Sequence, residues 1–213
     1  MATALEQDTL LVDEYLPEYG FIRVEHRVAH ASVAPTYEAM RSLDLMTVHS
    51  PITDLAMFTR TLPERVNRLF GREAEVSPPP ATLRLGDLFD GARNGETATL
   101  EGWVPLAEER GRELVFGAVG KPWMADIEWK TVPPFEFASF SEPGWAKIAA
   151  SVSVRPYATG RSILTYEART ALTDSDSERR FRRYWSLVSP FVGVIMRAVL
   201  RTVDERVGER PIA

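Results

Sequence analysis

The stretch SDSERRFRRYWSLVSPFVGVIMRAVLRTVDERV, residues 175–207, decides the fold. At about 100° per residue, its large apolar side chains fall on one side and its arginines on the other. Residues 175–178 have the pattern of a capping box, which marks the N-terminus of a helix. The stretch therefore predicts one long amphipathic helix. A kink or short break is expected near Ser189, because Pro190 follows it.

Two long strands are predicted directly before this helix, over residues 145–155 and 161–172. Both stretches alternate with the period of two that is typical of a strand, and residues 156–160 carry the proline and glycine of a turn. The two strands should therefore form a hairpin. The side chains expected to face the core are Ala146, Ile148, Ala150, Val152 and Val154 on the first strand and Ser162, Leu164, Tyr166, Ala168 and Thr170 on the second.

Three shorter strands are predicted further upstream, over residues 102–107, 112–119 and 124–131, separated by turn-forming residues as in a meander. Residues 133–144 are rich in proline and are expected to form a loop with one helical turn.

The first strand is predicted over residues 21–31, and short helices over 35–44, 51–60 and 63–70, each of which has a proline near its first turn. A lone strand needs partners for its backbone donors and acceptors, and only the later strands can supply them. We therefore expect a single domain over residues 1–213, with an inserted loop region at 72–98.

This order of elements resembles the helix-grip fold of the SRPBCC superfamily, which includes START lipid-transfer domains, the birch-pollen allergen family and polyketide cyclases. Three stretches look similar to a bacterial subgroup of these proteins: residues 13–19 (DEYLPEY), 134–147 (PFEFASFSEPGWAK) and 181–185 (FRRYW). The resemblance covers most of the chain outside 72–98. It implies an α+β fold in which a curved antiparallel sheet of about six strands wraps a long C-terminal helix. It also implies a cavity for an apolar or amphipathic small molecule, but no particular reaction.

Composition excludes several other classes of protein. A net charge of −5 and a pI of about 5.4 argue against nucleic acid as a partner. The absence of cysteine excludes disulfides, thiol catalysis and cysteine-based zinc sites. The acidic N-terminal residues do not fit a signal peptide, and no uninterrupted apolar run reaches the roughly 20 residues of a spanning helix. We expect a cytoplasmic protein without a cofactor; its oligomeric state is open.

His26 and His30 lie on the first predicted strand and are candidates for metal binding, ligand binding or proton transfer. On a strand, four residues separate their Cα atoms by roughly 13 Å at 3.3 Å per residue, so one metal ion cannot bridge them and no metal site is expected. A single one of them that points into the cavity could orient a ligand carbonyl or act as a general base. The alternative is a hydrogen-bonded histidine in the core or at its rim.

The remaining candidates for ligand binding are aromatic or apolar side chains that are expected to face the core. They are Phe116, Trp123, Tyr166, Tyr184, Trp185 and Val188. Tyr166 is also a candidate catalytic residue beside the two histidines. Aromatic residues on a core-facing stripe can equally be plain core.

The favoured hypothesis is a protein that binds a lipid, a polyketide or another ring-containing metabolite between sheet and helix, with residues 51–70 or 133–141 as lids. Its rival is a cyclase-like or dehydratase-like enzyme in which an inward histidine transfers a proton. A partner-binding protein with a filled core is a third hypothesis. Contact of the arginine face of the helix with a membrane surface is a minor alternative, because any core-packed helix turns a charged face to water.

Overall fold

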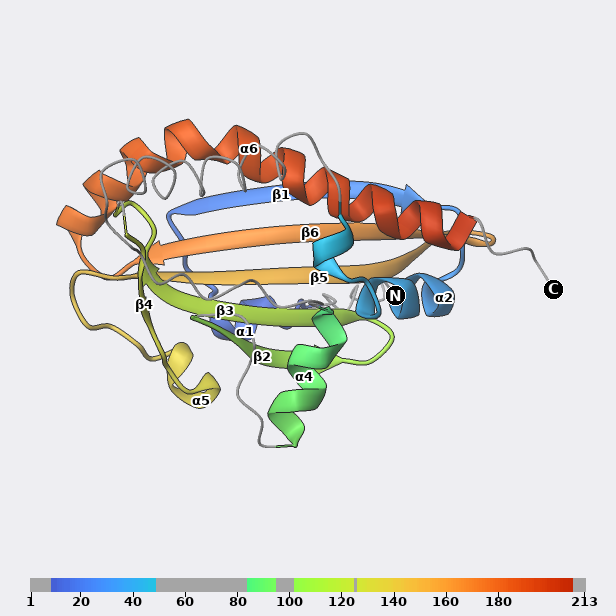
Figure 1. Cartoon of the computed structure of the whole chain (residues 1–213), viewed down its shortest axis with the longest axis horizontal. Helices are drawn as coiled ribbons and strands as arrows, with labels where there is room; N and C mark the ends of the chain where they lie inside the picture. The colour runs from blue at the N-terminus through green and yellow to red at the C-terminus, as the bar shows by residue number, and fades with distance from the viewer. Residues whose placement is uncertain (1–8, 49–83, 95–101, 125, 209–213) are drawn as a thin grey trace, which may run out of the picture.

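The structure is a computed structural model that describes residues 9–48, 84–94, 102–124 and 126–208. The strands are β1 (Phe21–Ala29), β2 (Trp103–Glu109), β3 (Glu113–Lys121), β4 (Glu128–Lys130), β5 (Ala146–Ala158) and β6 (Arg161–Leu172). They form one antiparallel six-stranded sheet in the order β1-β6-β5-β3-β2, and β4 pairs with the end of β3. The long helix α6 (Ser175–Gly208) lies across one face of this sheet (Figure 1). The predicted helix-grip architecture is confirmed.

The hairpin of β5 and β6 has the predicted faces. Val152 lies opposite Tyr166 and Ala150 opposite Ala168, and direct partners in an antiparallel pair share a face. Ala150, Val152 and Leu164 belong to the same buried cluster as Val199, Leu200 and Val203 of α6, so this face is the one under the helix. We call it the concave face. The observed β4 is shorter than the strand predicted over 124–131.

The helix α6 begins at Ser175, as predicted, but its cap is the residue before the predicted box. The Asp174 carboxylate accepts hydrogen bonds from the backbone N–H groups of Asp176 and Ser177, both at 2.9 Å. The helix runs to Gly208 without a break at Pro190.

In length and hydropathy α6 also meets the criteria for a helix that could cross a membrane. Its inner side, however, is covered by this protein: Met196, Val199, Leu200 and Val203 are each at most 4% exposed. One side of α6 is therefore part of the core, while Leu187 and Phe191 on the same helix are 71% and 45% exposed.

Two shorter helices complete the concave side, α2 (Val33–Arg41) and α4 (Leu85–Arg93). The expected loop at 72–98 is wrong for residues 85–93. Leu85, Leu88 and Phe89 have the spacing of one helix face, and all three are buried in the core. The helices predicted at 51–60 and 63–70 lie outside the described residues.

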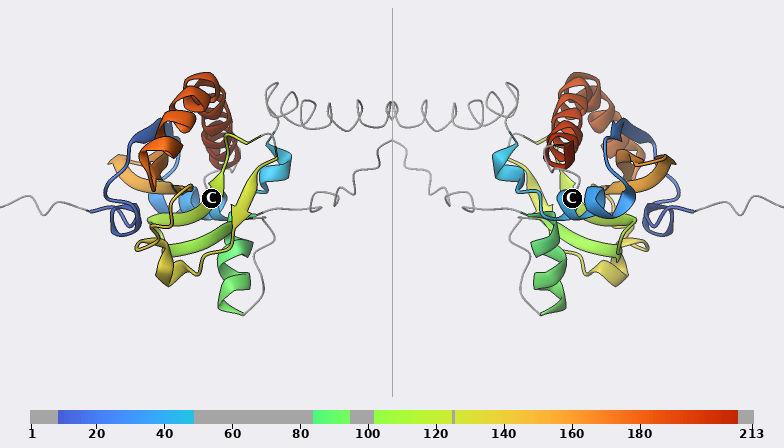
Figure 2. Two further views of the ribbon diagram at one scale, coloured as in Figure 1. Left: turned by 90° about the vertical axis from the view of Figure 1, so that its left-hand side faces the viewer. Right: turned by 90° about the vertical axis from the view of Figure 1, so that its right-hand side faces the viewer.

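The opposite, convex face is covered by the short helices α1 (Val12–Tyr15) and α5 (Pro134–Phe137), which confirms the helical turn predicted in 133–144 (Figure 2). The fully buried Glu113 of β3 fixes the start of α1. Its carboxylate accepts hydrogen bonds from the backbone N–H of Leu11 at 2.8 Å, from that of Val12 at 3.4 Å and from the Ser151 hydroxyl at 2.5 Å.

Removal of the Glu113 carboxylate is expected to destabilise the fold. Glu113→Ala leaves the two N–H groups and the Ser151 hydroxyl without their acceptor, which should lower the free energy of unfolding by about 3 kcal/mol in urea denaturation. Glu109→Ala, on an exposed carboxylate in the adjoining strand, is the matched control and should change it by less than about 0.5 kcal/mol. Equal effects of the two substitutions would contradict this role of Glu113.

Candidate functional site

Small side chains occupy the middle of the concave face. In two cross-strand rows, Ala118 lies opposite Ile148 and Ile148 opposite Thr170, while Ala150 lies opposite Ala168. Alanine and threonine extend little from a sheet, so a helix above them leaves space unless it comes closer. Ile148 and Ala168 stay partly exposed, although β5 is the middle strand of the sheet and β6 its neighbour. Ala118, Ala150 and Thr170 in the same rows are each at most 3% exposed, so the partial exposure is confined to Ile148 and Ala168.

Ion pairs attach α6 to the edge strand β1. The Arg197 guanidinium lies 2.7 Å from the Glu25 carboxylate, and Arg27 Nε lies 2.7 Å from the carboxylate of Asp204. Gly193 allows a close approach between them, because a Cβ at this position would lie 2.3 Å from the Arg23 guanidinium. The helix is thus held over the edge of the sheet (Figure 1).

This arrangement corrects the predicted position of the histidines. Since Glu25 and Arg27 face α6, His26 between them lies on the other face of the sheet, where it is exposed and its Nδ1 lies 2.9 Å from Thr165 Oγ1. His30 lies just beyond β1; its side chain is 63% exposed and its Nδ1 is 3.0 Å from Asp204. Neither histidine points into the space under α6.

The charged groups of β1 are electrostatically satisfied by their partners. Burial alone would raise the pKa of Glu25, but hydrogen bonds from Arg23 and Arg197 outweigh it and lower this pKa. For Asp204 also, burial acts to raise the pKa, and hydrogen bonds from His30 and Arg27 prevail and lower it. Both carboxylates therefore stay ionised at neutral pH.

Tyr166 is a polar group on the concave face whose hydroxyl has no hydrogen-bond partner among the described residues. It lies opposite Glu25 on β1 and Val152 on β5, it is partly exposed, and its hydroxyl makes no hydrogen bond to any described residue. Burial raises the pKa of Tyr166 to about 12, so its hydroxyl stays protonated and can donate a hydrogen bond.

The other predicted ligand-binding residues fall into two groups. Phe116 is buried on the concave face, where its ring lies 5.5 Å from that of Trp103, beside the small residues. Trp123, Tyr184 and Trp185 instead surround Phe181 near the start of α6, with ring centroids 5.6 to 6.2 Å from it. Val188, on the next turn of α6, is partly exposed.

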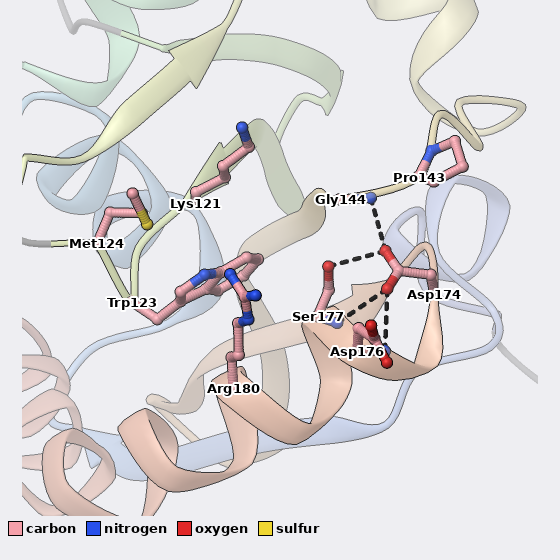
Figure 3. A pocket seen from close by; sticks show the side chains of 9 residues that line it. All are labelled: Lys121, Trp123, Met124, Pro143, Gly144, Asp174, Asp176, Ser177 and Arg180. Carbon is pink, nitrogen blue, oxygen red and sulfur yellow. Dashed lines mark hydrogen bonds between the residues drawn. The ribbon is translucent and has the colours of Figure 1, made fainter.

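A pocket of about 350 Å³ lies beside this aromatic group at the N-terminus of α6 (Figure 3). Trp123 forms one wall, near Arg180, and the Asp174 carboxylate lies opposite, hydrogen-bonded to Gly144 N–H at 2.6 Å and to Ser177. The Trp123 indole N–H is buried without a hydrogen-bond partner among the described residues. Aromatic and charged groups therefore line this pocket, at the end of the sheet where α6 begins.

Sequence reasoning missed Arg23, Glu25 and Arg197 as neighbours of the site. The alternation of charged residues along 21–27 was visible, but the partners that make the charged side face inward lie more than 170 positions away on α6. The pattern of β1 alone therefore could not show that its charged side faces α6.

Comparisons with known proteins give similarity to solved structures alone, at low sequence identity. No protein-family model and no curated protein matches the sequence. Among solved structures, the chain is similar to the Zhui aromatase/cyclase from Streptomyces sp. R1128, at 12% identity over 88% of this chain and 95% of that one, with a TM-score of 0.32. It is also similar to Ara h 8.0201 (10% identity, 89% and 99% covered, TM-score 0.27) and to norcoclaurine synthase from Thalictrum flavum (11%, 99% and 98%, TM-score 0.30).

All three are helix-grip proteins, the group that the element order resembles. Identities and scores this low carry nothing about ligand or activity. The fold assignment rests on the strand order and the long C-terminal helix of this chain itself.

Loss of the Asp204 charge is expected to weaken the attachment of α6. Asp204→Asn should lower the free energy of unfolding at pH 7 by about 2 kcal/mol, a value kept small because Arg27 and His30 are partly exposed. The pKa of Asp204 in the folded protein is below its ordinary value of 3.8. The larger free energy of unfolding of the wild type is therefore present above pH 3.8, and it disappears as the pH falls through the folded-state pKa.

The measurement is chemical denaturation at pH 7 and at a series of acidic pH values. Glu205→Gln, on the exposed neighbour that faces Arg201 at 3.7 Å, serves as the control and should have little effect. A wild-type advantage over Asp204→Asn that is absent at pH 7, or that grows toward acid, would show that the Asp204 pair does not hold the helix.

Proposed function

We propose that the chain binds an amphipathic, ring-containing small molecule between the concave face of the sheet and α6. The observation that carries this proposal is the hydroxyl of Tyr166. It is an unpartnered donor on a partly exposed side chain, beneath a helix and near the middle of a sheet. Solvent reaches this side chain, so a ligand oxygen that accepts a hydrogen bond from the hydroxyl can take the place of a water molecule there.

The surroundings of Tyr166 support an apolar ligand body with one polar end. Ile148 and Ala168, both partly exposed, offer a shallow apolar floor, and the buried ring of Phe116 and the partly exposed ring of Trp103 belong to the same core cluster. Flat aromatic walls favour a ring system over a flexible chain. Affinity would come mainly from apolar area removed from water, at about 25 cal/mol per Å² before the entropic costs of association.

The rival hypothesis of an acid–base catalyst has lost the two histidines on which it was based. His26 lies on the convex face, and His30 is exposed and held by Asp204. Binding is therefore the function that the described site supports best.

A pair of matched probes tests the role of Tyr166. Isothermal titration should show that the ketone 2-acetylnaphthalene loses about fivefold in affinity in Tyr166→Phe, the value of one net hydrogen bond. The hydrocarbon 2-ethylnaphthalene has the same ring and no acceptor, and its affinity should not change. Equal effects on both probes, or on neither, would contradict a hydrogen bond from Tyr166 to the ligand.

A substitution that fills the space over Ala168 tests whether the ligand binds on the concave face. Ala168→Trp places an indole over the floor and should weaken both probes by more than about tenfold. Ile163→Trp, on the same strand but on the opposite face, is the control and should leave binding unchanged. Binding that survives Ala168→Trp would place the ligand elsewhere.

A further inference from the structure

A second pocket, larger than the one at the N-terminus of α6, lies on the convex side, away from the concave face. It has a volume of about 640 Å³ and is formed by residues 14–20, by residues 138–141 after α5, and by the adjoining ends of β5, β6 and α6. The first two segments overlap the stretches 13–19 and 134–147, which resemble a bacterial subgroup of helix-grip proteins. The fold brings them together around Lys147 of β5, which lines the pocket.

The chain has three lysines, and Lys147 differs from the other two in its charge partners. Lys121 is paired with Glu128 at 2.6 Å, and Lys130 is paired with Glu142. Lys147 has no carboxylate partner among the described residues. Its ammonium donates to the backbone carbonyl of Ala138 at 2.8 Å and lies 5.9 Å from the centre of the Phe137 ring.

The ammonium of Lys147 is partly removed from water, and no opposite charge compensates for this among the described residues. Desolvation alone lowers the pKa of Lys147, because no nearby carboxylate compensates for the lost water. The group has three N–H donors, and one of them is used by the Ala138 carbonyl. Two donors are therefore left for an acceptor in the pocket.

The residues that line the pocket around Lys147 indicate which class of ligand it can bind. Tyr19 is stacked on the Arg169 guanidinium at 4.8 Å and lines the pocket together with Phe140 and Leu16, so the ligand body meets aromatic and apolar surface. Glu14 and Glu18 are exposed on the lining, and Glu178 is paired with Arg182. Carboxylates at the rim repel multiply charged anions such as phosphates.

We propose that this pocket is a second binding site, for an aromatic monocarboxylate whose carboxylate accepts hydrogen bonds from the ammonium of Lys147. A single carboxylate would supply the missing counter-charge, and the ring system would contact Tyr19 and Phe140, which both line the pocket. The site is independent of the concave face and of the function proposed for it.

The test is a comparison of 2-naphthoate with the neutral 2-naphthamide on the full chain at pH 7.5 by isothermal titration. The two have the same ring system, and the acid should bind at least about tenfold more tightly, as expected for a charge-assisted hydrogen bond. Lys147→Met should remove this preference. Lys121→Met, on a lysine that is already paired, should leave it unchanged.

Two further variants locate the binding. Ser141→Trp keeps Lys147 but fills the pocket from its exposed edge, and it should weaken 2-naphthoate by more than about tenfold. Ala168→Trp on the concave face should not affect 2-naphthoate, which separates this site from the one proposed above.

A structural role for Lys147 predicts a different result. If the lysine served only to hold α5 through the Ala138 carbonyl, Lys147→Met would lower the melting temperature and leave the acid-to-amide ratio as it is. No binding of 2-naphthoate at millimolar concentration, equal binding of acid and amide, or a preference that survives Lys147→Met would each overturn the proposal.

Discussion

The ion pairs between α6 and β1 determine how much of the sheet the helix covers. Glu25 and Arg27 point toward α6 and meet Arg197 and Asp204. A charge that has been taken from water needs its partner, so the helix cannot move toward β5 without leaving these groups unpaired. Since β1 is the edge strand, the helix stays over one side of the sheet, and Ile148 of the middle strand and Ala168 beside it stay partly exposed.

The hairpin and the terminal helix could be predicted from the sequence because their apolar side is also their buried side. Residues 145–172 alternate in this way, and Val199 and Val203 share a helix face with other apolar residues. For such elements periodicity and burial agree, and local pattern is enough.

The first strand could not be placed in the same way. Its period of two was clear, but periodicity shows which side chains share a face and not which face is inside. Ile22 is 40% exposed, while Arg23 and Glu25 lie under the helix, because their partners come from the other end of the chain. Tyr166 was predicted on the inward face, and its lack of a partner is a property that only the assembled structure reveals.

The two faces of the sheet offer different polar groups to a ligand. On the concave side this group is the neutral phenol of Tyr166, between Glu25 and Val152, and on the convex side it is the ammonium of Lys147, in a pocket lined by aromatic rings. The central claim is that the space between α6 and the middle strands is open. A crystal structure that shows ordered water tests this claim most directly: it should reveal water or a bound molecule hydrogen-bonded to Tyr166 between Ile148, Ala168 and the helix. Side chains packed into that space, with the Tyr166 hydroxyl bonded to protein, would contradict it.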